Sequence, residues 1–480
     1  MPGRNRPDGS NGPGVVAAAD RIAAAVPTSV IAVVDQVRDR GHAAYLVGGS
    51  VRDALIERAI DNWDLATDAR PDRLLELFPG AAYENRFGTV AVRRDNVLFE
   101  ITTFRVEHDY ADHRRPHRVE FGDDLEADLG RRDFTVNAMA WGGPATAAAG
   151  EARDSGFALV DPFGGLDDLE RRVLRAVGDP GARFGEDALR MVRAVRLSAT
   201  HDLVIESETL AAIAASAGLV EHLSGERVGA ELERLLEAPA PSTGLQPAMD
   251  TGLLAVLLPE LAAQRGVPQN KIPGEDLWAH TLRTVDAAPA DRPVVRLAAL
   301  LHDVGKPSTL ADGRFHHHDA AGATLAEALL RRLRFPRTTI ENVAHLVAQH
   351  MFTADPDASD AALRRFIRRI GPANVDALFE LRRADDIGSG VSPDDPATAA
   401  FRARVGAQLA ARPVLDRKAL AVDGDDLMRE LGLDPGPSLG RVLDALLDRV
   451  LVDPALNDRA TLMLLAQGML ADMPPTGDRR

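Results

Sequence analysis

The sequence predicts an α+β head at the N-terminus followed by an extended all-α body. Three observations lead to this fold class. Strand signals, which are short apolar runs bounded by turn residues, occur in residues 28–141 and nearly vanish from about residue 167 onward. Long segments with helical period follow that point. Aromatic residues make up only 4% of the 480 residues, and the dominance of alanine, leucine and valine favours helices packed on helices.

The head is predicted from alternating helix and strand signals. In chain order we expect a helix at 29–41, a strand at 44–48, a helix at 50–59, a strand at 63–67, a helix at 71–78, a hairpin at 88–106 that turns at Asp95–Asn96, and, after an interrupting loop at 142–156, a resumption of the fold at 157–169. Mixed order of this kind is typical of a sheet with covering helices.

The body is predicted to be helical, with breaks rich in proline and glycine near 239–246, 265–275 and 388–398. From these breaks we expect a flexible tail and lead-in at 1–27, a head at 28–166, a helical neck at 167–262, a histidine-rich helical module at 276–390 and a helical C-terminal segment at 391–480.

Composition narrows the function classes. The net charge of −16 argues mildly against a protein that binds nucleic acid over its whole surface, although clefts act locally. The chain has no cysteine, so disulfides and thiolate zinc sites are excluded. No apolar run approaches the ~20 residues of a membrane span, so we expect no membrane partner and a cytoplasmic protein.

A glycine pair, Gly48–Gly49, lies between a predicted strand and a predicted helix. Glycine lets backbone N–H groups approach a triphosphate closely, and the N-terminus of the following helix favours negative charge. Arg52, one turn into that helix, can pair with a phosphate oxygen. A glycine pair alone is more often only a tight connection, so the acids that follow it decide the interpretation.

The next predicted strand carries candidate metal ligands. Alternate strand residues face the same side, so Asn62 and Asp64 point together while Asp61 points the other way. Two carboxylates at this spacing would hold two Mg²⁺ ions, which align an attacking hydroxyl group with a leaving pyrophosphate. Glu100, in the predicted hairpin, is a candidate third acidic ligand, and the alternative is a salt bridge at a sheet edge.

Seven ordered motifs within residues 46–236 resemble the bacterial tRNA nucleotidyltransferase family, which includes the CCA-adding enzymes and the similar poly(A) polymerases. In order they are LVGGSVRD, WDLAT, EITTFR, RRDFTVNAMA, DPFGGLDDL, EDALRMVRAVRLSA and ERVGAELERLL. A chance match to seven ordered motifs is very improbable. The resemblance implies a polymerase-β-like nucleotidyltransferase head, and it implies the tRNA 3′ end, ATP and CTP as partners.

The resemblance also implies roles for residues of this sequence. Gly48, Gly49 and Arg52 would bind the incoming triphosphate, and the side chains at positions 62 and 64 would bind the catalytic Mg²⁺ ions. The residues that would contact the nucleotide, shape its site or belong to the helix that selects the base are Arg132, Asp133, Asn137, Asp187, Arg190, Arg193 and Arg196.

An aspartate and an arginine act in that family as an amino-acid template for the base, and Asp187 and Arg190 match them. Three residues apart, they would be neighbours on one helix face. A carboxylate accepts hydrogen bonds from an exocyclic amino group, and a guanidinium donates to ring and carbonyl acceptors. Together they could select C and A over G and U, whereas an isolated pair of this type is usually a surface salt bridge.

The sequence departs from the family at position 62, where Asn62 replaces an acid. The amide oxygen can bind a metal but is neutral, and the loss of one metal carboxylate costs roughly a thousandfold in rate. Three interpretations remain open. A bulge turns Asp61 inward, Asp64 and Glu100 suffice for a slower enzyme, or the head retains only binding.

Histidines and aspartates gather in the predicted helical module at 276–390. The set, which resembles the HD phosphohydrolase domain that some members of the same family carry, comprises His280, His302, Asp303 and Asp385 as metal ligands, with His318 and His350 as additional candidates. Imidazole and carboxylate ligands suit a divalent ion, here Mg²⁺, Mn²⁺ or Ni²⁺. In such domains the metal activates water against a phosphoester, and Lys306 could stabilise phosphate charge.

We therefore expect a Mg²⁺-dependent tRNA nucleotidyltransferase that adds CCA to the tRNA 3′ end from CTP and ATP, with the C-terminal segment at 391–480 packed against tRNA. Three alternatives remain open: an HD-type phosphohydrolase with a weakened head, a poly(A) or A-adding polymerase, and a non-catalytic RNA-binding protein. The oligomeric state stays open.

Overall fold

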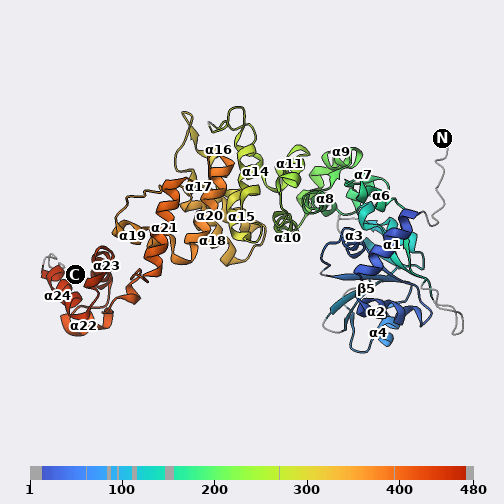
Figure 1. The fold of residues 1–480 in the computed structure, drawn as a ribbon, viewed down its shortest axis with the longest axis horizontal. Coiled ribbons are helices and arrows are strands. Elements are labelled where there is room, and N and C mark those ends of the chain that lie inside the picture. Colours follow the sequence, from blue (N-terminus) through green and yellow to red (C-terminus); the bar gives the residue numbers. More distant parts are fainter. Residues whose placement is uncertain are drawn as a thin grey trace. The chain divides into compact units, whose positions relative to one another are not determined.

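The computed structural model describes residues 13–60, 62–83, 88–94, 97–110, 116–145, 156–269, 271–393 and 395–471. Asp61 and the predicted turn at Asp95–Asn96 lie outside the described residues. The chain divides into two compact units between Ala263 and Gln264. Figure 1 colours the first unit from blue to green and the second from yellow to red.

A mixed sheet forms the head, as predicted. Among the described residues it has seven strands in the order β3-β4-β5-β2-β1-β8-β9. Their bounds are β1 Ala44–Val47, β2 Trp63–Thr67, β3 Ala82–Tyr83, β4 Thr89–Arg94, β5 Val97–Thr103, β8 Ala140–Gly143 and β9 Ala158–Val160. A separate antiparallel pair consists of β6 Arg105–Tyr110 and β7 Pro116–Phe121.

The pairing of β2 with β5 positions the acids. These two strands run parallel, whereas the other neighbours in the sheet run antiparallel. Asp64 lies directly opposite Glu100 in the register. The alternate residues Leu65 and Ile101 are buried on the other face of the sheet. Apolar packing on one face therefore leaves the two carboxylates together on the opposite face.

The head helices are α1 Pro13–Ala25, α2 Thr28–Arg38, α3 Gly49–Leu55, α4 Pro71–Leu77, α5 Leu125–Gly130 and α6 Gly165–Glu170, with a 3₁₀ turn, η1, at Thr135–Asn137. The expected lead-in at 1–27 contains α1. Ala18 and Ile22 on this helix are fully buried, and α1 packs against α3 and β9.

The neck consists of short helices, as the sequence predicts. They are α7 Pro180–Glu186, α8 Leu189–His201, α9 Ser207–Ser216, α10 Gly225–Leu236, α11 Ser242–Asp250, α12 Leu253–Leu257 and α13 Pro259–Ala262, with the 3₁₀ segment η2 at Ala217–His222. A short parallel pair, β10 Val173–Leu174 with β11 Val204–Ile205, joins them. Helix α8 packs against α10 and α11, which fixes its arginines relative to α10.

Among its described residues, the second unit is helical apart from one short hairpin, β12 Leu310–Ala311 with β13 Arg314–Phe315. Its helices are α14 Leu277–Ala287, α15 Pro293–Leu301, α16 Lys306–Thr309, α17 His318–Arg332, α18 Arg337–Gln349, α19 Asp360–Ile370, α20 Val375–Gly388, α21 Pro396–Ala410, α22 Gly424–Leu431, α23 Pro437–Val452 and α24 Arg459–Ala471, and its 3₁₀ turns are η3 Pro372–Asn374, η4 Arg417–Ala419 and η5 Pro454–Leu456. Helices α22–α24 share an apolar core that includes Leu427, Leu446 and Leu462.

Within the described part of the chain, no single helix has the length and hydropathy that crossing a membrane requires. The pair Gly14–Ala25 and Thr28–Arg38 meets the criteria of length and composition, but it bends by 111° between its two helices.

Candidate active site

The acid pair, Asp64 and Glu100, forms the floor of the candidate site. Because paired residues on neighbouring strands lie about 5 Å apart, the two side chains leave one face of the sheet side by side. Asn62 is exposed just before β2 begins at Trp63. The structure thus brings together Asp64 and Glu100, as predicted.

Two arginines set the charge around Asp64. This carboxyl group is partly buried, and burial raises its pKa above the usual value, while the positive charges of Arg132 and Arg193 oppose the rise. Arg132 follows α5, and Arg193 belongs to α8. The acid therefore lies in a cationic environment that suits a polyphosphate.

The glycine turn has the geometry that the sequence predicts. Gly48 connects β1 to α3 with a φ of 71°, in the left-handed region that favours glycine. A Cβ atom on Gly48 would lie 2.8 Å from Nη1 of Arg132. The absence of a side chain at this turn therefore makes room for a guanidinium beside the first turn of α3.

Arg52 is held from two sides. Its Nε and Nη2 atoms donate to the two carboxylate oxygens of Asp53, at 2.9 and 3.0 Å, and its Nη1 donates to Oδ1 of Asn137. Arg52 is only 7% exposed, so its guanidinium has one fixed position. Asn137, in η1, was predicted to shape the nucleotide site, and it does contact Arg52.

Asp133 links η1 to helix α8. Its Oδ1 accepts from Nδ2 of Asn137 at 3.0 Å, and its Oδ2 accepts from Nε of Arg193 at 2.7 Å. Although burial opposes ionisation, the charge of Arg193 and these hydrogen bonds hold the pKa of Asp133 far below its usual value. Asp133 is therefore a buried carboxylate that orients Arg193 rather than a proton donor.

The prediction that Asp187 and Arg190 are neighbours on one helix face is wrong. Helix α7 ends at Glu186 and α8 begins at Leu189, so Asp187 lies in the break with an extended backbone, φ −140° and ψ 106°. Its Oδ1 accepts from the N–H group of Leu189 at 3.0 Å, as an aspartate does at a helix start. The two side chains consequently have different partners.

Asp187 pairs with an arginine from α10 instead. Nη2 of Arg227 donates to its Oδ2 at 2.8 Å. The Nη1 atom of Arg190 donates to Oε2 of Glu186 at 2.6 Å, and its Nη2 donates to the carbonyl oxygen of Arg131 at 2.8 Å. Both predicted template side chains are thereby oriented by partners within the head and neck.

Sequence reasoning missed the partners on α10. Arg196 donates from Nε to Oε2 of Glu231, a buried residue. Arg227 and Glu231 are four residues apart in the ERVGAELERLL motif, so one face of α10 meets α8. That spacing was the available signal, because a charged pair on the apolar side of an amphipathic helix usually has a buried partner.

A second cluster of ligands lies in the other unit. Nε2 of His280 is 3.1 Å from Nε2 of His302, 3.4 Å from Oδ2 of Asp303 and 3.2 Å from Oδ1 of Asp385. Nε2 of His318 and His350 lie 3.4 and 3.7 Å from Oδ1 of Asp303. The six predicted ligands converge from α14, α17, α20 and the residues that directly follow α15 and α18. The adjacent His316 and His317 are exposed.

The imidazoles are oriented as metal ligands are. Nδ1 of His302, His318 and His350 hydrogen-bonds to the carbonyl oxygen three residues earlier, at 2.8, 2.8 and 2.7 Å. This bond places the proton on Nδ1 and turns Nε2 inward as a lone-pair donor. Within the described part of the chain, the buried Nε2 atoms of His318 and His350 have no hydrogen-bond partner.

Asp303 is shared by two groups of ligands. One is His280, His302 and Asp303, the other Asp303, His318 and His350, and the ligand atoms within each group lie within 4.8 Å of one another. Burial lowers the pKa of His350 to about 4, so its imidazole is neutral at pH 7. Lys306 donates to Oδ2 of Asp303 at 2.6 Å. These donors suit one or two divalent ions.

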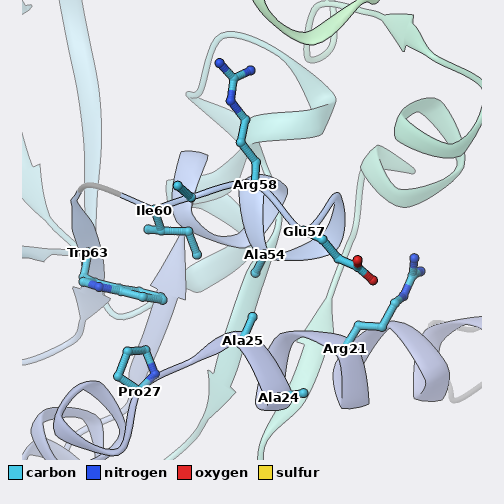
Figure 2. A pocket seen from close by; sticks show the side chains of 10 residues that line it. Arg21, Ala24, Ala25, Pro27, Ala54, Glu57, Arg58, Ile60 and Trp63 are labelled. Atoms are coloured by element: carbon cyan, nitrogen blue, oxygen red, sulfur yellow. The ribbon is translucent and has the colours of Figure 1, made fainter.

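A hollow of about 600 Å³ lies elsewhere in the head, between α1, the end of α3 and the start of β2. Figure 2 shows Trp63 and Pro27 on one side of it and Arg21 and Glu57 on another. Trp63 and Asp64 are successive strand residues, so this hollow lies behind the face that carries the acid pair. No predicted site residue lines it.

Comparison with protein-family models gives three matches in chain order. Residues 44–175 match the poly A polymerase head domain, residues 202–265 match a probable RNA and SrmB-binding site of polymerase A, and residues 274–383 match the HD domain.

Relatives and solved structures agree with these matches. The chain is 34% identical to the CCA-adding enzyme of Geobacillus kaustophilus over 89% of this chain and 94% of the relative, and 32% identical to that of Streptococcus gordonii over 86% and 90%. It is similar to the crystal structure of the Bacillus stearothermophilus CCA-adding enzyme in complex with CTP, with a TM-score of 0.68, 26% identity, and coverage of 92% of this chain and 97% of the other.

Proposed function

The chain belongs to the CCA-adding enzyme family, and we propose that it rebuilds the 3′-CCA end of tRNA from CTP and ATP, without a nucleic-acid template, at the site on the head. The observation that carries this proposal is the placement of Asp64 opposite Glu100, on the sheet face beside the glycine turn and its arginines. Acids beside a phosphate-binding turn are the arrangement that nucleotidyl transfer requires.

The tRNA 3′-hydroxyl group attacks the α-phosphate of the nucleotide in line, and pyrophosphate leaves. Asp64 and Glu100 would hold divalent metal, which we propose is Mg²⁺, with the amide oxygen of Asn62 as a neutral neighbour. When bound, the metal supplies charge neutralisation at the triphosphate and lowers the pKa of the attacking hydroxyl group. The donor set fits this ion because carboxylate and amide oxygens are hard ligands.

The phosphates would be held by the turn at Gly48–Gly49 together with Arg52 and Arg132. Backbone N–H groups at the start of α3 point toward an anion, as they do at other helix N-termini. Arg52 is fixed by Asp53 and Asn137, so it loses little side-chain entropy when it meets a phosphate. We propose that these groups bind CTP and ATP alike, because they do not contact the base.

We propose that base choice rests with Asp187 and Arg190, each held by its own partner. The Asp187→Ala variant is expected to lower the preference for CTP over UTP by about ten- to a hundredfold, because a carboxylate accepts a hydrogen bond from the amino group of cytosine but not from the carbonyl of uracil. Competition between labelled CTP and UTP on tRNA that lacks CCA measures this ratio.

The matched control for base choice is Asp167→Ala, which removes an exposed carboxylate paired with Arg171 in the same unit. That variant should keep the preference of the native chain. An unchanged CTP preference in Asp187→Ala would remove this residue from base selection.

Labelled CTP and ATP, supplied with tRNA lacking its CCA end and with magnesium, test the proposed function directly. Incorporation of both labels supports CCA addition. Incorporation of ATP alone indicates a poly(A) or A-adding polymerase. Phosphate release from a cyclic phosphate ester, without incorporation, indicates a phosphohydrolase with a silent head. Retention of tRNA with neither reaction indicates an RNA-binding protein.

A second candidate function is metal-dependent hydrolysis of a phosphoester at the HD cluster. The observation that favours it is the convergence of three inward-facing imidazole Nε2 atoms on Asp303, a fully buried carboxylate. Burial opposes its ionisation, yet His302 and the surrounding histidines hold the pKa of Asp303 well below the usual value. Mg²⁺, Mn²⁺ or Ni²⁺ would fit this donor set, and cyclic nucleotides or tRNA 2′,3′-cyclic phosphate ends are candidate substrates.

Asp303→Asn is expected to weaken Mn²⁺ binding at the HD cluster by at least about a hundredfold, since Asp303 belongs to both ligand groups. Loss of a residue that only hydrogen-bonds to a metal ligand already lowers metal affinity about ten- to a hundredfold. Equilibrium dialysis against Mn²⁺ gives the number of ions bound and their affinity. The His317→Ala variant, which removes an exposed histidine beside His318, serves as the control and should bind Mn²⁺ like the native chain. Equal binding by Asp303→Asn would contradict the metal assignment.

The remaining expectations concern partners. We propose that the neck at 167–262 and the C-terminal segment at 391–480 contact tRNA through its phosphates and shape rather than its sequence. Because we propose a tRNA substrate, we also propose that the protein acts in the cytoplasm.

A further inference from the structure

His201, the last residue of α8, has a buried partner in the head. Its side chain is 5% exposed, and its Nε2 lies 3.2 Å from Oδ1 of Asp53 on α3. Its Nδ1 lies 2.8 Å from Oγ1 of Thr200. Helix α8 carries the arginines assigned to the nucleotide, while α3 begins at the glycine turn assigned to the phosphates. The contact therefore joins two elements with different tasks.

Asp53 contacts both His201 and Arg52. The two carboxylate oxygens of Asp53 accept from Nε and Nη2 of Arg52, and the same Oδ1 also meets His201. Burial raises the pKa of Asp53, but the hydrogen bond with His201 and the charge of Arg52 more than offset it and lower the pKa below the usual value. Asp53 is therefore ionised at neutral pH and holds Arg52 in one plane.

A series of hydrogen bonds leads from Arg52 back to α8. From Arg52 it continues to Asn137, then to Asp133, and then to Arg193, which lies two turns before His201 on the same helix. Helix α8 is thus tied to the phosphate side of the site by hydrogen bonds at two points, Arg193 and its last residue, His201. A helix held at two points keeps a fixed distance between its base-selecting arginines and Arg52.

The protonation state of His201 fits the role of donor. Burial lowers its pKa, so the ring is neutral above pH 7. The neutral ring with its proton on Nε2 donates to Asp53, and the Thr200 hydroxyl group then donates to Nδ1. The groups that face His201 are Asp53 with Arg52 on α3, Arg58 after α3, and Thr200 on its own helix.

We propose that His201 is a positioning residue that fixes Arg52, through Asp53, for the triphosphate of the incoming nucleotide. This inference rests on the proposed function of the head. Because Arg52 contacts the phosphates and not the base, loss of the His201 contact weakens the binding of CTP and of ATP by the same factor. Loss of the His201 contact affects nucleotide binding more than the chemical step, so KM rises while kcat changes little.

The experiment compares two substitutions at position 201 in the full chain. His201→Leu is expected to raise KM for both CTP and ATP about tenfold, with kcat within about twofold, because a hydrogen bond to a charged group is lost. His201→Gln retains an N–H donor and is expected to stay within about threefold of the native KM. Equilibrium binding of CTP to each variant gives the same comparison without catalysis.

The matched control is His42→Leu, since Nδ1 of His42 is also 3.2 Å from a carboxylate, Oδ1 of Asp68, outside the connected set. That variant should leave KM unchanged. The proposal is overturned if His201→Leu binds CTP like the native chain, if leucine and glutamine are equally damaging, or if ATP and CTP respond by different factors. Failure of the native chain to extend tRNA would instead overturn the proposed function, while the CTP-binding comparison still decides the role of His201.

Discussion

The Asp64→Asn variant is expected to lower kcat for CMP addition by at least about a thousandfold. Position 62 already carries an amide, so this change would leave Glu100 as the only carboxylate of the proposed ligand set in the described residues. Loss of one metal carboxylate removes several kcal/mol of transition-state stabilisation, and each 1.4 kcal/mol is about tenfold in rate. Burial in a site with Arg132 and Arg193 strengthens the effect, because charges interact more strongly away from water.

Single-turnover incorporation of labelled CTP into tRNA that lacks CCA measures this rate without interference from product release. Asp72→Asn is the control, because it changes an exposed acid in the first turn of α4 by the same single oxygen-to-nitrogen replacement. The control should keep the native rate. If Asp64→Asn retains more than about a tenth of the native rate, the acid pair does not bind the catalytic metal.

The Asn62→Asp variant is expected to raise the rate of CMP addition, whereas Asp64→Asn lowers it. Asn62→Asp adds a carboxylate two residues before Asp64, at the exposed position that precedes β2. The alternation predicted from the sequence turns this side chain to the side of Asp64. A third anionic ligand, beside Asp64 and Glu100, offsets the charge of two divalent ions better than an amide does, so the rate at limiting magnesium should rise by as much as about a thousandfold. The magnesium concentration for half-maximal rate should fall at the same time.

A magnesium titration of CMP incorporation measures both quantities. Asn62→Leu is the matched variant, since it has a similar volume and no oxygen, and it should require more magnesium than the native chain. If neither variant shifts the magnesium dependence, position 62 does not face the metal, and the interpretation that Asp61 reaches inward through a bulge is favoured.

Much of the head was predictable because its signals are local. The alternation of side chains along a strand placed Asp64 on a polar face, and the glycine pair predicted the turn between β1 and α3. The pairing of β2 with β5 confirmed that Glu100 joins Asp64. The first two inferences use residues within about one element of each other, where period and turn chemistry suffice. The pairing of Asp64 with Glu100 instead joins two strands that are separated in sequence by α4, β3 and β4.

The helix break at Asp187 was not predictable from period alone. Residues 186–199 contain good helix formers, so propensity favours one continuous helix. The break instead satisfies tertiary partners, because Arg227 on α10 donates to the carboxylate of Asp187 and Arg190 donates to the carbonyl oxygen of Arg131. Contacts between residues 40 positions apart are not visible in a periodic pattern, and they overrode the local preference.

The HD cluster was predictable in part from the sequence. Its six ligands were predicted from residue types and the family resemblance, and they do converge, with Asp385 placed by its contact with His280. The sequence does not reveal which imidazole nitrogen faces inward, because that depends on the carbonyl oxygens of Ala299, Phe315 and Val347. It also does not reveal that Asp303 divides the ligands into two groups, since this depends on how the helices cross.

The length of the RNA product formed by the unaltered protein tests the central claim most directly. Given magnesium, CTP, ATP and tRNA ending before its CCA, the native chain should extend the RNA by three nucleotides, read on a sequencing gel, and then stop. The contrary result is an RNA that remains unextended with the native chain while Asn62→Asp lengthens it. In that case the head of this protein binds nucleotides without joining them.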